Sequence, residues 1–513
     1  MPRLRGLARV CLGTTHPRQH GATCGGARGR NAAGGGGQPV PLSRPTRPGH
    51  GACRRTQRQP VRRRLPLARL GGPAHGAAAA LHALGRGALG AGRRAGAARS
   101  RLGSRSRPVP VRGGGLRRAR RELPGHPGAL LRRRRAGPAE VSRVPAVFER
   151  AHQCGRARAG QVYLRGHEVP TPAFMPVGTY GSVKGMHPDD LASAGARILL
   201  ANACHLHDRP GEDVVAGLGG VQRLMGWKGP VLTDSGGFQV FSMLHVAKLD
   251  EDGVSFRSPI DGRTLRLTPE SVVDVQLALN SDVAMVLDHC PPLPAEARLL
   301  NQSVARTTRW ARRARERHRA ACVHGQAQFG IVQGGLDDAL RARSAAELTE
   351  LQFDGYAMGG LSVGEGSEAL QAAATRYAPL LPPHKVRYLM GVGRPQDLLA
   401  AIAAGFDLFD CVLPTRNGRH GTVFRGHGVV HLRNARFRGA LGPLDEQCDC
   451  RTCAEWDVGT LAHLIRASEP LGRSLCTLHN LRFLHRLMQR ARDAILADAL
   501  PTLLHEWGLS APD

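Results

Sequence analysis

Two aspartates stand in strings where a pair of carboxylates could act on a sugar carbon. Asp234 lies in VLTDSGGFQ (231–239), and Asp410 lies in FDLFDCVLPTRNGRHG (406–421). One carboxylate can attack the C1′ atom of a ribose and form a covalent glycosyl ester, while the other moves a proton to or from the departing group. An aspartate that follows a strand can also simply cap the next helix. For this pair, the surrounding strings favour displacement chemistry at a glycosidic carbon.

A second group of chemistry-bearing residues lies near the C-terminus. Cys448, Cys450 and Cys453 fall within six residues, and His479 follows 26 residues after the last of them. Three thiolates and one imidazole make a closed tetrahedral ligand set for Zn²⁺, with no open position for a substrate. The spacing therefore predicts one structural zinc ion per subunit, which would fix the C-terminal segment and take no part in catalysis.

The elements that must position the two aspartates are short apolar runs that alternate with helix-like segments. The predicted strands are Ile198–Leu200, Val231–Thr233, Val283–Leu287, Phe329–Val332, Tyr356–Met358, Val386–Leu389 and Leu408–Phe409. The predicted helices include Pro188–Ala194, Pro269–Leu279, Ala295–Ala321, Asp337–Gln352 and Pro395–Ala404. Such alternation over about 250 residues predicts an α/β fold with a parallel sheet and, at this length, a (β/α)8 TIM barrel. A doubly wound open sheet is the second choice, although no glycine-rich dinucleotide turn follows the first strand.

Polar residues and glycines fall just past the carboxyl ends of these strands. They are Asp234, Asp288, Gln333, Gly360, Gly391 and Asp410. In a barrel, that end of the strands is the active-site face. The alternation stops near Ala440. We therefore predict a catalytic barrel over residues 145–440 and a zinc-binding subdomain with C-terminal helices over residues 441–513.

The net charge of +32 is concentrated in the first part of the chain. Residues 1–140 contain 31 of the 72 basic residues and 2 of the 40 acidic ones, which leaves residues 141–513 with a net charge of +3. This Arg/Gly/Ala/Pro-rich segment has too little apolar surface to fold, so we predict a disordered basic extension. An RNA-binding tail, a targeting presequence and a mis-called start are the three explanations. We favour a true start near Val141 or Val144, and we leave the segment out of the fold.

The chain resembles the bacterial-type tRNA-guanine transglycosylases of the queuosine pathway from about residue 148 to residue 504. The strings that carry the resemblance keep the family's order and spacing. They are TPAFMPVGTYGSVKG (171–185), NACHLHDRPG (202–211), TDSGGFQVFS (233–242), FGIVQGG (329–335), GYAMGGLSVGE (355–365), YLMGVGRPQDLL (388–399) and FDCVLPTRNGRHG (409–421).

The resemblance implies roles for individual residues. Asp410 would be the nucleophile, and Asp234 the general acid–base. The implied base-binding residues are Asp234, Ser235, Gly236, Gly237, Phe238, Asp288, Gln333, Gly360, Leu361 and Met390. The chemistry agrees, because a flat purine needs a carboxylate for its N–H donors, an amide for its carbonyl and apolar groups above and below its ring. The glycines would let the backbone approach such a ligand closely.

The resemblance also implies that two stretches contact the anticodon loop of tRNA. They are Gly391, Val392, Gly393, Arg394, Pro395, Gln396 and Asp397, and then Thr415, Arg416, Asn417, Gly418 and Arg419. Arginine side chains there could hold phosphates and position an unstacked nucleotide. Further basic clusters at Arg306–Arg319 and Arg433–Arg438 are candidates for RNA contacts, although such runs are more often solvated surfaces.

The implied reaction exchanges the wobble guanine, at position 34, of tRNAs with GU(N) anticodons (those for Asp, Asn, His and Tyr) for 7-aminomethyl-7-deazaguanine. Double displacement would pass through a covalent enzyme–RNA intermediate. Val363 and Cys290 match the bacterial members, which indicates a pocket for the smaller base rather than queuine. Two departures stand near the pocket: His289 replaces the family's glutamate in an Asp-Glu-Cys string, and Asn202-Ala203-Cys204-His205 replaces Asn-Thr-Tyr-His.

Other functions compete with this one. A non-catalytic tRNA-binding subunit of the same family would keep the zinc ligands, but Asp234 and Asp410 argue against it. A metal-dependent barrel hydrolase could use His205 and His207, but no evident partners follow the later strands; packing within a turn is the favoured interpretation. Nine cysteines outside the extension form no disulfide pattern, and no apolar run is long enough for a membrane. We expect a cytoplasmic protein and, from the resemblance, a homodimer.

Overall fold

The computed structural model describes residues 146–238, 247–322 and 325–511. The predicted extension over residues 1–140 and the proposed starts at Val141 and Val144 lie outside the described residues, so those predictions stay untested. No helix among the described residues is both long enough and apolar enough to cross a bilayer.

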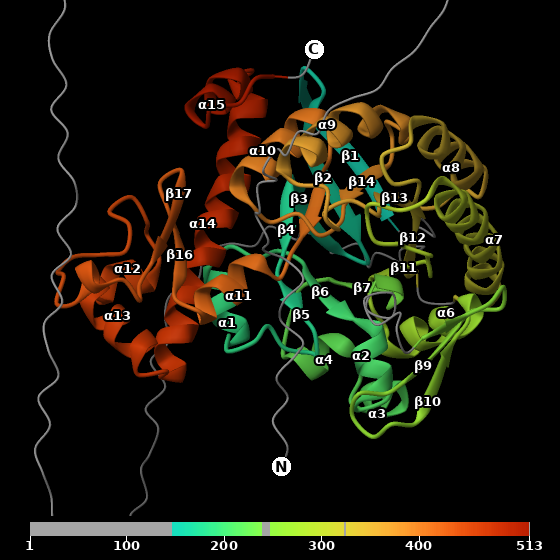
Figure 1. Ribbon diagram of the computed structural model, residues 1–513, viewed down its shortest axis with the longest axis horizontal. Helices are drawn as coiled ribbons and strands as arrows, with labels where there is room; N and C mark the ends of the chain where they lie inside the picture. The colour runs from blue at the N-terminus through green and yellow to red at the C-terminus, as the bar shows by residue number, and fades with distance from the viewer. Residues whose placement is uncertain (1–145, 239–246, 323–324, 512–513) are drawn as a thin grey trace, which may run out of the picture. The chain divides into compact units, whose positions relative to one another are not determined.

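A closed parallel barrel forms the centre of the described chain (Figure 1). Its strands run in the order β4-β15-β14-β13-β12-β11-β7-β6-β5. Only Pro176 separates β4 from β5; β4 pairs with β15 and β5 pairs with β6, so the two segments act as one strand that closes an eight-membered ring. This arrangement confirms the predicted (β/α)8 fold. The strands are β4 (Ala173–Met175), β5 (Val177–Gly178), β6 (Leu199–Asn202), β7 (Val231–Asp234), β11 (Val283–Met285), β12 (Ala327–Val332), β13 (Gly355–Met358), β14 (Val386–Leu389) and β15 (Leu408–Asp410).

Helices follow the barrel strands and cover the outside of the sheet. They are α1 (Pro188–Ser193), α2 (Ala203–Asp208), α3 (Glu212–Gly217), α4 (Val221–Met225), α6 (Pro269–Leu279), α7 (Ala297–Ala321), α8 (Asp338–Glu350), α9 (Ser367–Tyr377) and α10 (Pro395–Ala404). Local signals set the ends of α6: Thr268 and Ser271 form a reciprocal capping box around Pro269, and Asn280 ends the helix in the left-handed region. For α10, Pro395 begins the helix and Gly405 ends it in the same way. Both helices have the predicted bounds.

Two three-stranded antiparallel sheets accompany the barrel and were not predicted. The first contains β1 (Ala146–Cys154), β2 (Ala157–Leu164) and β3 (His167–Thr171). The second contains β8 (Lys248–Leu249), β9 (Val254–Arg257) and β10 (Thr264–Leu267), and lies in the chain between β7 and α6. Its inner face belongs to a buried apolar cluster that includes Phe256, Leu267 and Trp310 of α7.

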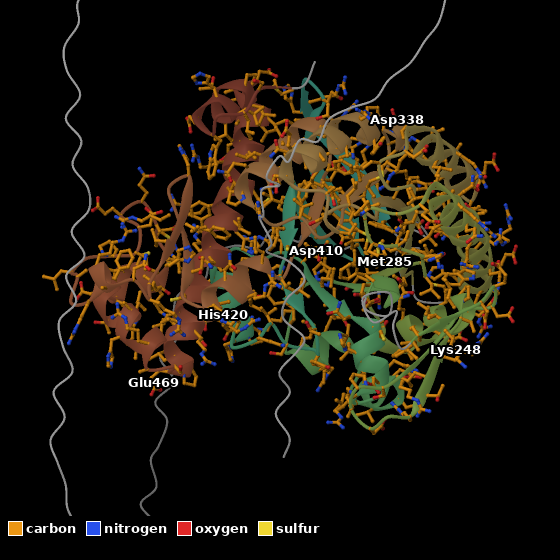
Figure 2. All side chains as sticks on the ribbon, in the orientation of Figure 1. Lys248, Met285, Asp338, Asp410, His420 and Glu469 are labelled. Carbon is orange, nitrogen blue, oxygen red and sulfur yellow. The ribbon has the colours of Figure 1, made fainter. Side chains whose placement is uncertain are left out.

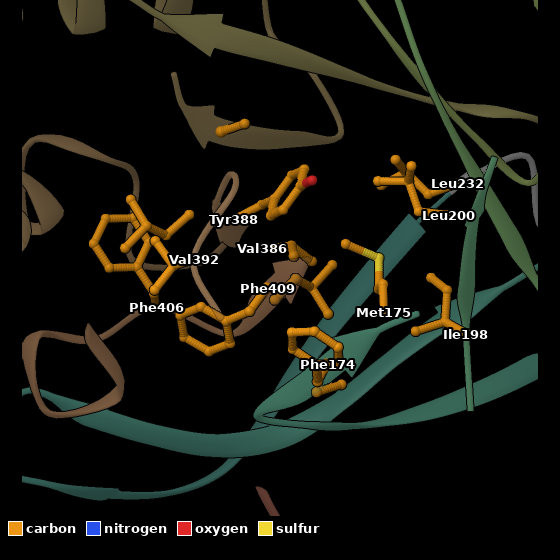
Figure 3. Packing of buried hydrophobic residues seen from close by; sticks show 14 of the residues in the cluster. Phe174, Met175, Ile198, Leu200, Leu232, Val386, Tyr388, Val392, Phe406 and Phe409 are labelled. Atoms are coloured by element: carbon orange, nitrogen blue, oxygen red, sulfur yellow. The ribbon is translucent and has the colours of Figure 1, made fainter. Parts of the chain in front are cut away.

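The apolar core fills the barrel and the layer between strands and helices. Figure 3 shows Phe174, Met175 and Phe409 meeting among the side chains of neighbouring strands, where the β4–β15 register sets Phe409 opposite Phe174. Phe174 and Phe409 are almost completely buried. Core packing of this density holds the strand ends rigid, which is what a site assembled from several strands requires.

The C-terminal part packs against the barrel through one long helix. Its elements are α11 (Leu413–Arg419), β16 (Thr422–Arg425), β17 (Gly428–His431), α12 (Arg451–Glu455), α13 (Val458–Arg466), α14 (Pro470–Leu496) and α15 (Leu500–Glu506). Helix α14 contacts α11 and β16 as well as β1, β2 and β4 of the barrel side. A second apolar cluster contains the three predicted zinc-ligating cysteines together with Val423 and Leu432. The predicted boundary at residue 440 stays a prediction, although this cluster begins on β16.

Candidate active site

Asp410 is held at the carboxyl end of β15 by two donors from the neighbouring strand and the turn after it. The Tyr388 hydroxyl donates to its Oδ1 over 2.5 Å, and the Gly391 backbone N–H donates to the same oxygen over 2.9 Å. Burial raises the pKa of Asp410, and the bonds from Tyr388 and Gly391 oppose that rise. No sequence pattern marks Tyr388 as a functional residue. An aimed carboxylate with one oxygen fixed suits a nucleophile.

Replacing Tyr388 by Phe removes the hydroxyl that opposes the rise in the pKa of Asp410. The pKa of Asp410 should therefore rise further, and the acidic limb of a kcat/KM profile should move to higher pH. At neutral pH we expect kcat to fall about 10- to 100-fold, because the Asp410 carboxylate is no longer held in the orientation that attack requires. Rates measured across pH with both proteins test this. An unmoved acidic limb would mean that Tyr388 does not act through Asp410.

Asp234 ends β7 and is anchored by the adjacent strand. The register places Asn202 of β6 opposite Asp234. The Asn202 side-chain amide donates to Oδ2 of Asp234, and the Ala203 backbone N–H donates to Oδ1 over 3.0 Å. Asn202 lies in one of the family strings, but no local pattern there indicates this contact. The Asn202 side chain and the Ala203 backbone, at the start of α2, thus orient the Asp234 carboxylate.

Asp410 and Asp234 both raise the pKa of the Tyr388 phenol. Burial and Asp410 raise the pKa of the Tyr388 phenol well above its usual value, and Asp234 adds to the rise. Asp234 is the last residue of β7 and Asp410 is the last residue of β15, so both carboxylates stand at the carboxyl-end face of the barrel. Figure 2 labels Asp410 at this end of β15, beside the start of α11. The structure therefore brings together the predicted catalytic pair.

Asp288 and Gln333 form a second polar pair within the barrel mouth. The Gln333 Nε2 atom donates to Asp288 Oδ2 over 2.6 Å, and both side chains are buried. A Cβ on Gly237 would lie 2.5 Å from Asp288 Oδ1, and one on Gly360 would lie 2.4 Å from Gln333 Oε1. A Cβ on Gly237 would also lie 2.9 Å from the Asp288 backbone carbonyl oxygen, and Gly360 has a left-handed φ of 63°, so both positions favour glycine. Burial raises the pKa of Asp288 to about 6, against the bonds from Gln333 and Ser235.

The other predicted base-binding residues surround this pair. Ser235 is buried and its Oγ accepts from the Gly237 N–H over 3.3 Å. Leu361 is buried, Met390 is partly buried, and the Phe238 ring is 55% exposed. Gly236 adopts a left-handed φ of 81° beside Cys204. An exposed aromatic side chain such as Phe238 could close over a flat ligand.

The buried Arg341 holds the loop at Gly360 through hydrogen bonds to backbone carbonyls. The Arg341 guanidinium donates to the carbonyls of Gly335, Val332 and Gly360 over 2.9, 2.8 and 3.3 Å. Its side chain is fully buried, so the three carbonyls satisfy donors that water cannot reach. The sequence did not reveal this residue's role, since arginines on amphipathic helices are usually exposed.

His289, one of the two departures near the pocket, is buried beside Asp288. Its Nδ1 lies 3.1 Å from Arg306 Nη1, and Arg306 in turn pairs with Glu251. Burial and then Arg306 lower the pKa of His289 to about 4. The imidazole is therefore neutral at neutral pH, with Nδ1 as the acceptor and the proton on Nε2.

Some residues of the two predicted RNA-contacting stretches are exposed, and others are buried. Arg394 and Arg416 are exposed, whereas the side chains of Val392, Asp397 and Thr415 are buried. Asp397 accepts hydrogen bonds from Ser367 and Gln371. The remaining members are the half-buried Gly391, Gln396, Asn417 and Arg419 and the buried Gly393, Pro395 and Gly418. Direct side-chain contacts to RNA are thus open to the arginines, and the buried members shape the backbone.

The two histidines considered for a metal-dependent hydrolase have structural partners. The His205 ring packs 4.8 Å from the Tyr180 ring, and His207 Nδ1 lies 2.7 Å from Glu212. Among the residues that the structure describes, the group able to hold a metal ion is the C-terminal set and does not include them. These contacts agree with the packing and hydrogen bonding expected for the HLH string, but both histidines lie in helix α2 rather than in a turn.

Cys448, Cys450, Cys453 and His479 meet as predicted, with all four ligand atoms within 4.8 Å of one another. The His479 Nδ1 atom lies 3.2 Å from Cys453 Sγ, while its Nε2 lies 2.7 Å from the Phe424 carbonyl. A proton on Nε2 donated to that carbonyl leaves Nδ1 available to ligate, as in known metal sites. This closed sulfur-rich donor set fits a metal ion of the zinc type.

Comparisons with known proteins agree with this geometry. A family model described as queuine tRNA-ribosyltransferase matches residues 153–512. A queuine tRNA-ribosyltransferase of Thiobacillus denitrificans is 50% identical over 348 residues, covering 68% of this chain and 94% of that protein. A Thermus thermophilus protein of the same name is 50% identical over 351 residues, covering 68% of this chain and 90% of its own length. The chain therefore belongs to the queuine tRNA-ribosyltransferase family, the bacterial-type tRNA-guanine transglycosylases.

Proposed function

We propose that this enzyme exchanges the wobble guanine of tRNAs with GU(N) anticodons for 7-aminomethyl-7-deazaguanine, by double displacement. The observation that supports the proposal most is that Asp234 and Asp410 each end a strand of the same parallel barrel, where Asn202 bonds to the first and Tyr388 to the second. The Asp288–Gln333 pair beside them offers what a purine edge requires. A carboxylate pair and a purine-reading pair together serve base exchange at C1′.

In the first displacement, Asp410 would attack C1′ of the wobble ribose. An Asp410 oxygen forms the new C–O bond as the C1′–N9 bond breaks and the electron pair leaves with guanine. A proton from Asp234 neutralises the departing base. The fixed Oδ1, which accepts from Tyr388 and Gly391, leaves Oδ2 as the attacking atom. The product is a covalent RNA–enzyme ester.

In the second displacement, the incoming base would reverse these steps. N9 of 7-aminomethyl-7-deazaguanine attacks C1′, its proton passes to Asp234, and the bond to Asp410 breaks. The anchors on Asp234 from Asn202 and Ala203 hold it in place for both proton transfers. Two inversions at C1′ restore the original configuration of the nucleoside.

Base recognition would use the buried polar pair. The Asp288 carboxylate accepts from the N1–H and exocyclic amine of the guanine edge, while the Gln333 amide donates to its carbonyl. Leu361 and the Gly360 backbone flank this edge, and Phe238 with Met390 covers the ring faces. Cys290 and Val363 belong to one apolar cluster, and near this end of the pocket they would exclude the bulkier queuine. The first base released and the second base bound share the same edge, so one pocket serves both.

Replacing Asp288 by Asn should lower the activity without lowering the stability of the fold. An amide cannot accept both N–H donors, so we expect kcat/KM for the base to fall about 1000-fold. The pKa of Asp288 is raised to about 6 on folding, so its ionised form destabilises the fold, progressively between the ordinary value near 3.8 and 6. At pH 7 the variant should therefore match or exceed the unmutated melting temperature. A lower melting temperature would contradict the burial argument.

The raised pKa of Asp288 also predicts how base binding depends on pH in the unmutated enzyme. As pH falls through about 6, Asp288 gains a proton and loses an acceptor. KM for the free base should therefore rise as the pH drops below about 6. Base-exchange kinetics from about pH 5 to about pH 8, with RNA held saturating, measure this. A KM that is constant over this range would exclude Asp288 as the acceptor.

Zn²⁺ is the proposed metal, with Cys448, Cys450, Cys453 and His479 as its ligands in a structural role. Arg394, Arg416 and Arg419 would hold phosphates beside the exchanged nucleotide. We also propose that the enzyme is a homodimer and that it is located in the cytoplasm, together with its tRNA substrate. None of the catalytic steps passes through the metal.

Incorporation of labelled guanine into unmodified tRNA tests the proposal. We expect incorporation into tRNAs with GU(N) anticodons and none when the wobble guanine is replaced by adenine. Displacement of the label by 7-aminomethyl-7-deazaguanine, with queuine inactive, would support the choice of base. An unmutated enzyme that binds tRNA but incorporates no guanine would instead support the non-catalytic subunit.

A further inference from the structure

The Arg341 guanidinium on α8 is a buried cation that forms no ion pair with any acidic side chain that the structure describes. Its side chain is completely buried. Burial lowers the pKa of Arg341 to about 10, so the group keeps its positive charge at neutral pH. Burial of a charge without an ion pair is costly, because the hydration of that charge is lost. The groups to which Arg341 bonds must therefore offset the cost.

These groups belong to the ends of two neighbouring barrel strands. The Val332 carbonyl, at the last residue of β12, accepts from Arg341 Nη1 over 2.8 Å, and the Gly335 carbonyl, in the loop after β12, accepts from Nε over 2.9 Å. The Gly360 carbonyl, two residues after β13 ends at Met358, accepts from Nη2 over 3.3 Å. Strands β12 and β13 pair in parallel, with Val332 opposite Met358. One planar guanidinium therefore joins two adjacent strand ends at the barrel mouth.

The Gln333 side chain lies between these two strand ends. A Cβ on Gly359 would lie 2.8 Å from Gln333 Nε2, and a Cβ on Gly360 would clash with Gln333 Oε1, so the amide packs against the backbone of both glycines. The Gln333 N–H also donates to the buried Ser344 Oγ over 3.1 Å. Ser344 and Arg341 lie three residues apart on α8. The same face of this helix (Figure 1) therefore holds both the Gln333 backbone and the Gly360 carbonyl.

Arg341 supports one end of the base pocket and not the other. Asp288 follows β11, which pairs with β12 on the side away from β13. Among the described residues, the hydrogen-bond partners of Arg341 all lie in β12, in β13 or in the loops after them, and none lies at the strand end that carries Asp288. Loss of Arg341 should therefore disturb the end of the pocket formed by Gln333 and Gly360 first.

We propose that Arg341 is a positioning residue that sets the selectivity of the pocket for the carbonyl of the base. This inference rests on the proposed function, in which Gln333 donates to that carbonyl and the Gly360 backbone flanks it. Arg341 acts through the backbone carbonyls that it binds. It holds the two strand ends at one separation, so the Gln333 amide is fixed where an oxygen atom fits. A pre-organised site binds the matching atom tightly, and it rejects a larger or weaker acceptor for the same reason.

The test compares three free bases that differ at one end of the purine edge. 6-Thioguanine carries sulfur in place of the carbonyl oxygen of guanine, and hypoxanthine lacks the exocyclic amine that would donate to Asp288. Calorimetry on the full chain gives the dissociation constant of each base. Arg341→Lys keeps the charge, but a single ammonium cannot span three carbonyls as the guanidinium does. We expect the preference for guanine over 6-thioguanine to fall about 10-fold, and the preference over hypoxanthine to change by less than about 2-fold.

Arg492→Lys is the matched control, because Arg492 of α14 also donates to three backbone carbonyls. Its guanidinium bonds to Thr171 over 3.0 Å and to Pro170 and Pro172 over 2.8 and 3.1 Å. These residues come just before β4 begins, at the amino end of that strand and away from the barrel mouth. The control loses the same kind of bonds, so it should lower the melting temperature as Arg341→Lys does and leave both preferences unchanged.

Ser344→Ala tests the same support if Arg341→Lys does not fold. This change removes the acceptor of the Gln333 N–H, so the preference for guanine over 6-thioguanine should again fall, by about 3-fold. An equal loss of both preferences, or the same loss in the Arg492→Lys control, would overturn the inference. If the unmutated enzyme exchanges guanine and the variants keep its preference over 6-thioguanine, the proposed function stands and this inference fails. If the unmutated enzyme binds no guanine, both fail.

Discussion

Asp410→Asn should abolish base exchange while leaving tRNA binding almost intact. The amide is isosteric with the carboxylate, so the contacts of Tyr388 and Gly391 to the retained oxygen can survive. An uncharged amide is a poor nucleophile, and without attack at C1′ no glycosyl ester forms. We expect incorporation of labelled guanine to fall by about four orders of magnitude or more, as when other covalent nucleophiles are removed.

The controls for this variant separate chemistry from folding. Asp189→Asn, on the exposed start of α1, makes the same chemical change away from the site and should keep full activity. The dissociation constant of Asp410→Asn for tRNA should stay within a few-fold of that of the unmutated enzyme. Because burial raises the pKa of Asp410, loss of its charge removes a cost of folding, so the melting temperature should not fall. Residual exchange above about 1% of the unmutated rate would show that another group attacks C1′.

Loss of the zinc ligands should destabilise the C-terminal part and, through it, the site. Cys448→Ser removes one of four ligands, and structural zinc sites of this kind bind with apparent free energies of about 10 kcal/mol or more. We expect the variant to lose its zinc and at least about 3 kcal/mol of the free energy of unfolding. Metal analysis should show one zinc ion per chain in the unmutated protein and much less than one in the variant.

Activity should fall with the zinc because α14 links the metal to α11. His479 reaches the Phe424 carbonyl on β16, and the next residue, Asn480, donates to the carbonyls of Pro414 and Thr422 over 3.0 Å each. Pro414 lies in α11, four residues after Asp410. The matched change Cys154→Ser, on β1 and outside the site, should affect neither zinc nor rate. A zinc-free Cys448→Ser variant with full activity would contradict this coupling, and a second bound metal would revive the hydrolase.

The barrel could be predicted from sequence because each parallel strand is an apolar run bounded by turn signals. All seven predicted strands occur, with ends shifted by a few residues. The first strand was missed because Pro172 and Pro176 interrupt it, and its pairing with β15 is set by closure of the ring rather than by local preference. The sheet of β8, β9 and β10 was missed because its strands are short, and its apolar side chains become significant only once they pack on Trp310.

The positions of the two proposed catalytic aspartates and of the four proposed zinc ligands could be predicted because strand ends and cysteine spacing carry that information. The residues that hold them could not. Tyr388 reads as one more apolar strand residue, Asn202 as a turn residue, and Arg341 as a surface cation of a helix. Each owes its role to groups on another element of the fold, which no local pattern reveals. Net charge was also a poor guide, since several arginines of α7 pair with acidic side chains from other elements, which no local pattern reveals.

Covalent attachment of Asp410 to C1′ of the substrate nucleotide can be observed directly. Enzyme is mixed with tRNA in the absence of free base, then denatured, digested with nuclease and protease and analysed by mass spectrometry. We predict a ribose-linked adduct on the peptide that contains Asp410, lost when 7-aminomethyl-7-deazaguanine is added before denaturation and absent from Asp410→Asn. An adduct on Asp234, or full turnover of base with no adduct on either aspartate, would contradict the assignment.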